Sequence, residues 1–134
     1  MKKLKFIVVD DNVTFLNGIV FYLENILLHE VIGYAVNGKE FLDQKESFYE
    51  ADIILMDVQM PEFNGIEATQ RYLSIYHNAK VIAVTNFPDI VYLRELINAG
   101  FKGCVFKNRI YEDLPAAIET VRKENLYFPS DIKL

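Results

Sequence analysis

The sequence predicts an α/β domain in which helices cover both faces of a parallel β-sheet. Short apolar runs alternate with longer helical patterns five times along the 134 residues. The short runs are apolar at successive positions, a pattern typical of strands that are buried on both faces. The length suits one domain, since a domain usually holds about 100–200 residues. Together these observations favour a doubly wound sheet of five parallel strands.

The first predicted strand and helix lie at the start of the chain. Residues 6–10 are rich in β-branched side chains, which indicates a buried strand. Apolar residues then recur at helical spacing from Val13 to His29. Asn12 or Asp11 can cap the start of that helix, because both residue types accept hydrogen bonds from backbone N–H groups.

The second and third strands are predicted over residues 31–36 and 53–56. Between them, the segment Asn37-Gly-Lys-Glu40 has the pattern of a capping box. This pattern predicts a short helix that ends at about Ser47.

The second half of the chain continues the alternation after a loop that contains Pro61 and Gly65. The elements expected there are a helix over 66–76, a strand over 80–84, a helix from Pro88 to Ala99 that Gly100 ends, a strand over 103–106, and a last helix with an apolar stripe at Leu114, Ala117, Ile118 and Val121.

Composition excludes several classes of protein. The chain has 14 Lys and Arg against 19 Asp and Glu, and this net charge of −5 is unfavourable for binding nucleic acid. The single cysteine, Cys104, excludes an intrachain disulfide and a cysteine-based zinc cluster, and it suits a reducing compartment. The apolar runs are far shorter than the about 20 residues that cross a bilayer. We therefore expect a cytoplasmic domain that binds neither a membrane nor, by itself, nucleic acid.

Polar residues gather at the predicted carboxyl ends of four strands. Asp10 and Asp11 follow the first strand, Asp57 the third and Thr85 the fourth, and the fifth leads into Lys107. Because the carboxyl ends of parallel strands meet at one edge of the sheet, these side chains are expected to form one site.

Each of these residues has a simpler explanation when it is taken alone. The aspartate pair can cap a helix, Asp57 can belong to a turn, Thr85 can be an ordinary strand residue and Lys107 a solvated charge. The combination is harder to explain in this way, since three neighbouring carboxylates repel one another. A hard divalent cation relieves that repulsion, and Mg²⁺ prefers one or two carboxylates together with water and phosphate.

Four segments carry a resemblance to a known family: Val8-Val-Asp-Asp11, Ile54-Leu-Met-Asp-Val-Gln-Met-Pro-Glu-Phe-Asn-Gly65, Val84-Thr85 and Phe106-Lys107. Their order and spacing make the chain, from Lys5 to about Lys123, resemble the receiver domains of bacterial two-component response regulators. The resemblance implies a flavodoxin-like fold with the strand order 2-1-3-4-5.

The resemblance also implies roles for these residues. Asp57 is the expected acceptor of a phosphoryl group from a sensor histidine kinase. Asp10, Asp11, Asp57 and the backbone carbonyl of Gln59 are the expected ligands of Mg²⁺, for which Mn²⁺ can substitute. Thr85 is expected to hydrogen-bond the phosphoryl group and Lys107 to pair with it. Such a domain catalyses its own phosphorylation and the hydrolysis of the resulting aspartyl phosphate, and it is not a classical enzyme.

The C-terminal part of the chain indicates a subgroup of the family. Lys107 is followed by Asn108, where many receivers have proline, and together with residues 125–132 this resembles receivers of the NarL/LuxR type. We therefore expect a receiver over residues 1–124. We expect residues 125–134 to be an extension toward an absent helix-turn-helix domain that controls transcription. A stand-alone receiver remains an alternative.

Two further departures from the family concern the expected switch. Asn86 stands where a small residue is usual, and Cys104 stands where an aromatic side chain usually turns inward on activation. A cysteine is too small to fill that space, so Asn86 and Phe87 are expected to carry the coupling instead.

Alternatives from other classes also remain at this point. A phosphorylation-independent adaptor is disfavoured by the complete set of polar residues. A haloacid-dehalogenase-like phosphatase needs Asp-x-Asp, whereas Asp10 is followed by Asp11 and Asn12. A flavin binder needs donors where this first loop is acidic. As a receiver, the domain is expected to form a homodimer on phosphorylation.

Overall fold

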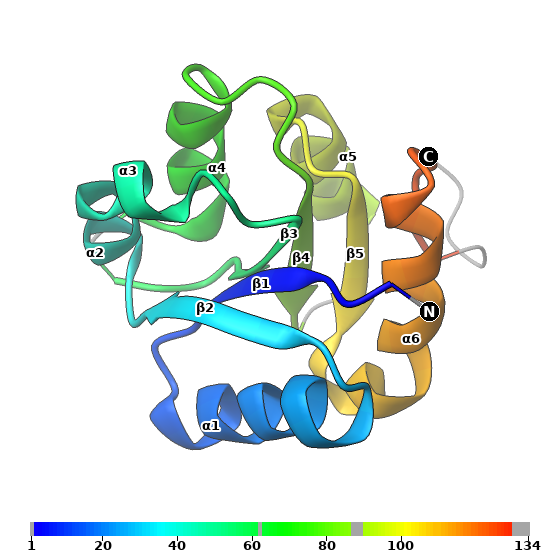
Figure 1. The fold of residues 1–134 in the computed structure, drawn as a ribbon. Coiled ribbons are helices and arrows are strands. Elements are labelled where there is room, and N and C mark those ends of the chain that lie inside the picture. The colour runs from blue at the N-terminus through cyan, green and yellow to red at the C-terminus, as the bar shows by residue number, and fades with distance from the viewer. Residues whose placement is uncertain (1, 62, 87–89, 130–134) are drawn as a thin grey trace.

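The computed structural model, which describes residues 2–61, 63–86 and 90–129, contains a five-stranded parallel sheet (Figure 1). Its strands are β1 (Lys5–Val9), β2 (Glu30–Ala35), β3 (Ile53–Asp57), β4 (Val81–Thr85) and β5 (Gly103–Phe106). Their order in the sheet is β2-β1-β3-β4-β5, and every neighbouring pair is parallel. The predicted fold class and strand order are therefore confirmed.

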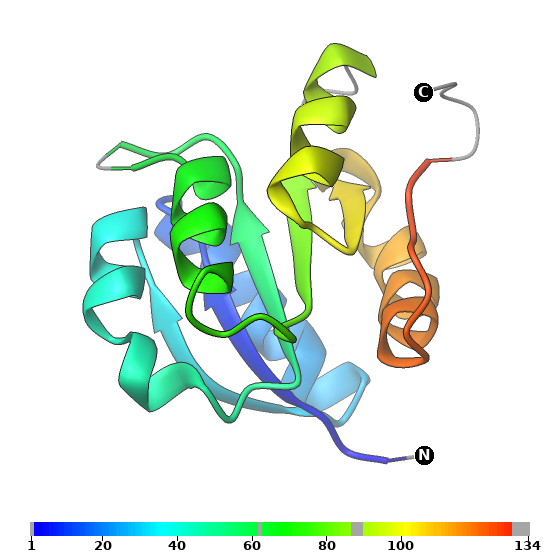
Figure 2. The ribbon, with the colours of Figure 1, turned by 90° about the horizontal axis from the view of Figure 1, so that it is seen from above.

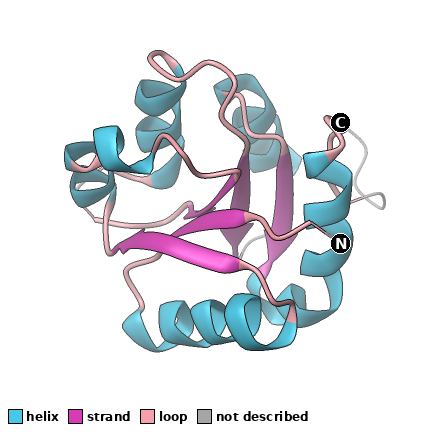
Figure 3. Ribbon diagram, viewed as in Figure 1, coloured by secondary structure: helices cyan, strands magenta, loops and turns pink. Residues whose placement is uncertain are grey.

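Helices cover both faces of the sheet (Figures 1 and 3). The helical elements are α1 (Val13–Phe21), η1 (Tyr22–Ile26), α2 (Gly38–Asp43), α3 (Lys45–Phe48), α4 (Gly65–Leu73), α5 (Ile90–Ala99), η2 (Lys107–Arg109) and α6 (Ile110–Arg122). Successive strand residues point to opposite faces. Thus Ile7 packs into the core shared with α2 to α5, whereas Phe6 packs into the core shared with α1 and α6. None of the described helices is long and apolar enough to cross a membrane.

The first helix differs from the continuous helix predicted over residues 13–29. Asn12 caps its start, and its side-chain oxygen accepts a hydrogen bond from the N–H of Phe15 at 3.0 Å. Beyond Phe21 the chain widens into the π-helical segment η1, where the N–H of Leu27 bonds the carbonyl of Tyr22. Leu28 then takes a positive φ of 62° and ends the helical stretch. Apolar spacing alone does not report this change of hydrogen-bond register.

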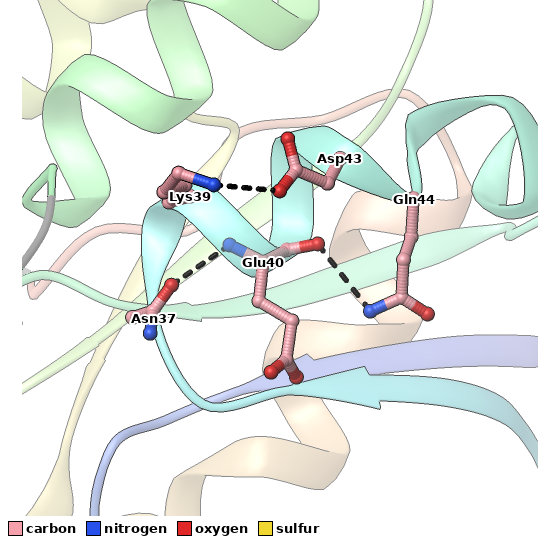
Figure 4. Close-up of polar contacts among 5 residues, drawn as sticks. All are labelled: Asn37, Lys39, Glu40, Asp43 and Gln44. Atoms are coloured by element: carbon pink, nitrogen blue, oxygen red, sulfur yellow. Dashed lines mark hydrogen bonds and ion pairs between the residues drawn. The ribbon is translucent and has the colours of Figure 1, made fainter.

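The predicted capping box opens α2 (Figure 4). The Asn37 side-chain oxygen accepts a hydrogen bond from the N–H of Glu40 at 2.7 Å, and the Glu40 carboxylate accepts one from the N–H of Val36 at 3.2 Å. Lys39 and Asp43 form an ion pair one turn apart. The helix ends at Asp43, and α3 is a separate turn of helix, so the single helix predicted to about Ser47 is wrong in this detail.

Helix ends elsewhere also differ from the sequence patterns. The helix predicted to run to residue 76 ends at Leu73, where the His77 ring lies 2.9 Å from the Leu73 carbonyl oxygen. Gly100 follows α5 with a φ of 102°, a conformation that glycine adopts without strain, and it ends the helix as predicted.

A short C-terminal segment lies along β5, which is one of the two edge strands of the sheet. Residues 125–129, the red chain beside α6 in Figure 2, run past β5, and Tyr127 forms a parallel bridge with Gly103. The N–H of Cys104 donates to the Tyr127 carbonyl at 2.8 Å, and the N–H of Tyr127 donates to the Lys102 carbonyl at 3.0 Å. This segment therefore adds two backbone hydrogen bonds to the edge strand.

Candidate functional site

Three carboxylates meet at the carboxyl edge of the sheet. Asp10 follows β1 and Asp57 ends β3, and both are buried, with 2% and 4% of their surface exposed. Asp11 is exposed beside them. One oxygen from each of the three side chains lies within 4.8 Å of the others. The structure thus brings together the three aspartates that the sequence predicts as metal ligands.

Lys107 reaches this cluster from the end of β5. Its Nζ atom lies 2.9 Å from Asp10 Oδ2 and 3.5 Å from Asp57 Oδ2. Only 14% of the lysine side chain is exposed. The ammonium therefore neutralises part of the negative charge at the bottom of the site.

The environment of Asp57 disfavours its charged form. Burial raises the pKa of Asp57, and the nearby Asp10 carboxylate raises it further, whereas the Lys107 ammonium lowers it; the resulting pKa is about 7. One ammonium does not offset the burial and repulsion of these carboxylates. The cluster therefore suits an additional cation.

The remaining predicted site residues lie at the ends of neighbouring elements. Thr85 is buried at the end of β4, opposite Phe106 of β5. Gln59 and Asn86 are exposed, in the chain that follows β3 and β4 respectively. Phe87, the predicted coupling residue, lies outside the described residues.

Gly65 brings the start of α4 against the backbone of Asp57. A Cβ atom at this position would lie 2.2 Å from the Asp57 carbonyl oxygen, and the Gly65 N–H donates to the Val58 carbonyl at 2.8 Å. The loop that leaves Asp57 therefore returns so closely that a side chain has no room. This is the physical reason for the glycine that ends the motif from Asp57 to Gly65.

Cys104 is fully buried in the core shared with α2 to α5. Burial raises the pKa of its thiol to about 12. Its backbone pairs with Tyr127, so the C-terminal segment contacts the strand that leads to Lys107. Its part in switching stays a prediction.

The sequence reasoning missed one neighbour of the site. The Lys107 Nζ atom lies 4.6 Å from the centroid of the Phe15 ring, in the first turn of α1. The only available signal was an aromatic residue placed shortly after the acidic pair.

Comparison with known proteins places this site in a family. A family model described as a response regulator receiver domain matches residues 6–119. The chain belongs to the receiver-domain family. Receivers are signalling domains of two-component systems and not classical enzymes. The phosphatase and flavin-binder alternatives therefore do not apply.

The relatives of this receiver include a transcriptional regulatory protein and an oxygen regulatory protein. The chain is 30% identical over 129 residues to the transcriptional regulatory protein LnrK of Bacillus subtilis (strain 168), covering 96% of this chain and 58% of that protein. It is 33% identical over 132 residues to the oxygen regulatory protein NreC of Staphylococcus aureus (strain JH9), covering 98% of this chain and 59% of that protein. The receiver thus spans less than two thirds of the length of either relative.

A solved structure supports the fold. A LuxR-family two-component response regulator from Aurantimonas sp. SI85-9A1 matches with a TM-score of 0.87 at 23% identity, covering 98% of this chain and 93% of that one. The predicted resemblance to receivers of the NarL/LuxR type is confirmed.

Proposed function

We propose that Asp57 accepts a phosphoryl group from a sensor histidine kinase and that the aspartyl phosphate switches a protein-binding surface. The observation that carries the proposal is the convergence of Asp10, Asp11 and Asp57 within 4.8 Å, with the Lys107 ammonium 3.5 Å from Asp57. A carboxylate nucleophile beside a fixed cation suits an incoming group whose oxygens already carry negative charge.

The donor set fits Mg²⁺. Three carboxylates supply hard oxygen ligands, and burial together with the repulsion from Asp10 raises the pKa of Asp57, so a divalent cation would stabilise the charged carboxylates. Asp10, Asp11, Asp57 and the backbone carbonyl of Gln59 are the proposed ligands, and Mn²⁺ is expected to substitute. When bound, the cation supplies charge neutralisation for the phosphoryl oxygens.

The transfer itself uses residues of this chain. An Asp57 carboxylate oxygen attacks the phosphorus, the bond from phosphorus to the donor imidazole nitrogen breaks, and its electron pair stays on that nitrogen. Lys107 pairs with a phosphoryl oxygen, and the Thr85 hydroxyl donates a hydrogen bond to another. Attack by water later releases inorganic phosphate and restores the carboxylate.

The test is intact-mass measurement after incubation with acetyl phosphate and Mg²⁺. We expect one added phosphoryl group that is lost at alkaline pH and does not form when Mg²⁺ is removed by chelation. Asp57→Asn, which keeps the size of the side chain, is the matched control and is expected to remain unlabelled. Equal labelling of both chains would refute the assignment of the acceptor, and an unlabelled native chain would favour the adaptor.

The output is proposed from the relatives. Because LnrK is a transcriptional regulatory protein and this receiver spans 58% of its length, we propose that the domain works in a longer, cytoplasmic transcription regulator. Residues 125–134 are then the proposed start of the linker to a DNA-binding domain.

Phosphorylation is proposed to favour a homodimer. The α1 and α6 face carries the exposed apolar side chains Val13, Phe21 and Tyr111, and the face formed by α5, β5 and α6 is the alternative. Sedimentation at micromolar concentration, with and without beryllofluoride and Mg²⁺, tests this expectation. A monomer under both conditions would exclude self-association as the output.

A further inference from the structure

The Lys107 ammonium has a partner besides the carboxylates of the site. Its Nζ atom lies 4.6 Å from the centroid of the Phe15 ring, within the distance at which a cation is attracted to an aromatic face. Phe15 is only partly buried and packs against the core under α1 and α6. The ring thus lies between that core and the site.

Phe15 is held in place by the same residues that build the site. The Asp10 Oδ1 atom accepts a hydrogen bond from the Asn12 N–H at 2.8 Å, and the Asn12 Oδ1 atom accepts one from the Phe15 N–H at 3.0 Å. Lys107 returns to Asp10 Oδ2 at 2.9 Å. Asp10, Asn12, Phe15 and Lys107 therefore form a closed circuit of contacts.

We propose that Phe15 is a positioning residue, whose ring holds the Lys107 ammonium at the place where it pairs with the phosphoryl group. The proposal deepens the proposed function and rests on it. Lysine carries its charge on a flexible four-carbon stem, so an ammonium without further support samples many positions. The ring limits this sampling before the phosphoryl group arrives, and a preorganised cation binds an anion more tightly.

The circuit also links the two ends of the site. Asp10, Asn12 and Phe15 follow β1, whereas Lys107 follows β5, and β3 and β4 lie between them in the sheet. Among the contacts described, the Lys107 ammonium reaches across this distance through its ion pairs with two carboxylates and through its contact with the Phe15 ring. Replacing the ring is therefore expected to loosen Lys107 while leaving both aspartates in place.

The first test compares Phe15→Leu, which keeps apolar bulk without an aromatic face, with Phe15→Tyr, which keeps the face. Beryllofluoride binding in the presence of Mg²⁺ is expected to weaken about fivefold in Phe15→Leu, the effect of one cation–π contact, and to stay within about twofold of native in Phe15→Tyr. The matched control is Tyr49→Leu, another aromatic-to-leucine change, at an exposed position directly after α3, and it is expected to bind as the native chain does. Equal binding by all four chains would overturn the proposal.

The second test is a double-mutant cycle in urea unfolding with Lys107→Met, which removes the charge and keeps the stem. Phe15→Leu is expected to raise the unfolding equilibrium constant by a factor that is about five times larger in the native background than in the Lys107→Met background. An identical effect in both backgrounds would show that Phe15 only fills space. Because the cycle needs no phosphoryl group, it still decides the Phe15 contact if the native chain binds no beryllofluoride, a result that would count against the proposed function.

Discussion

Replacing Gly65 with alanine should disturb the site without touching any of its polar side chains. The added Cβ atom would lie 2.2 Å from the Asp57 carbonyl oxygen and 2.9 Å from the Val58 Cα atom. Ordinary contact begins at about 3.4 Å, so the two segments must separate by about 1 Å. Both neighbours are backbone atoms, which cannot rotate away as a flexible side chain can.

The size of the effect follows from that displacement. Forcing an extra carbon into a packed backbone contact costs about 1–3 kcal/mol of unfolding free energy. A shift of about 1 Å in a reacting group can slow chemistry about 100-fold. We therefore expect Gly65→Ala to be phosphorylated by acetyl phosphate about 100-fold more slowly than the native chain while remaining folded.

Intact-mass time courses with Mg²⁺ and acetyl phosphate measure the rate, and urea unfolding measures the stability. The matched control is Gly18→Ala in α1, where the new Cβ atom meets only the Tyr111 hydroxyl oxygen, at 3.2 Å. That variant is expected to be phosphorylated at the native rate. Its unfolding free energy is expected to rise by up to about 1 kcal/mol, since alanine favours a helix more than glycine does. Native labelling and native stability in Gly65→Ala would refute the reasoning.

Three other predictions concern buried polar groups. The Thr69 hydroxyl has no hydrogen-bond partner within the described part of the chain, so Thr69→Val should raise the unfolding free energy by about 1 kcal/mol in urea titrations; a loss would contradict this. Burial lowers the pKa of His29 below 6.5, although the nearby Asp52 carboxylate raises it. As the pH falls, His29 therefore takes up a proton more readily in the unfolded chain than in the folded chain, and the unfolding free energy should decrease as the pH drops through about 6.5. His29→Asn, which keeps an acceptor for the Leu4 N–H, should weaken this pH dependence in thermal unfolding, and an unchanged slope would exclude His29 as its source. Because burial raises the pKa of Cys104 to about 12, iodoacetamide at pH 8 should modify the folded chain far more slowly than the urea-unfolded chain, and equal rates would contradict its burial.

The sequence was sufficient for the fold and the acidic cluster because both depend on regular patterns. Apolar runs such as residues 53–56 report strands buried on two faces, and their order along the chain constrains the sheet. Parallel strands then bring Asp10, Asp57 and Lys107 to one edge wherever the exact strand ends fall. The helix cap formed by Asn37 could also be predicted from the sequence, since it depends only on contacts between residues close together in the chain.

The features that could not be predicted depend on contacts between distant segments or on small changes in helix register. The apolar residues of the segment Tyr22–Ile26 are spaced along the sequence as in an α-helix, so their pattern does not reveal that this segment is a π-helical turn. The approach of Phe15 to Lys107 depends on side-chain directions after two separate strands. The pairing of Tyr127 with Gly103 joins segments that no local pattern connects.

That pairing has a consequence for how the molecule avoids association through its sheet. An edge strand with unpaired backbone groups is a template on which another chain can add a strand. Tyr127 occupies this position on β5 by accepting from the Cys104 N–H and donating to the Lys102 carbonyl. A chain shortened to residue 124 would expose those groups beside the buried, β-prone run from Gly103 to Phe106. The few residues after α6 therefore protect the β5 edge from pairing with a strand of another chain, which would lead to aggregation.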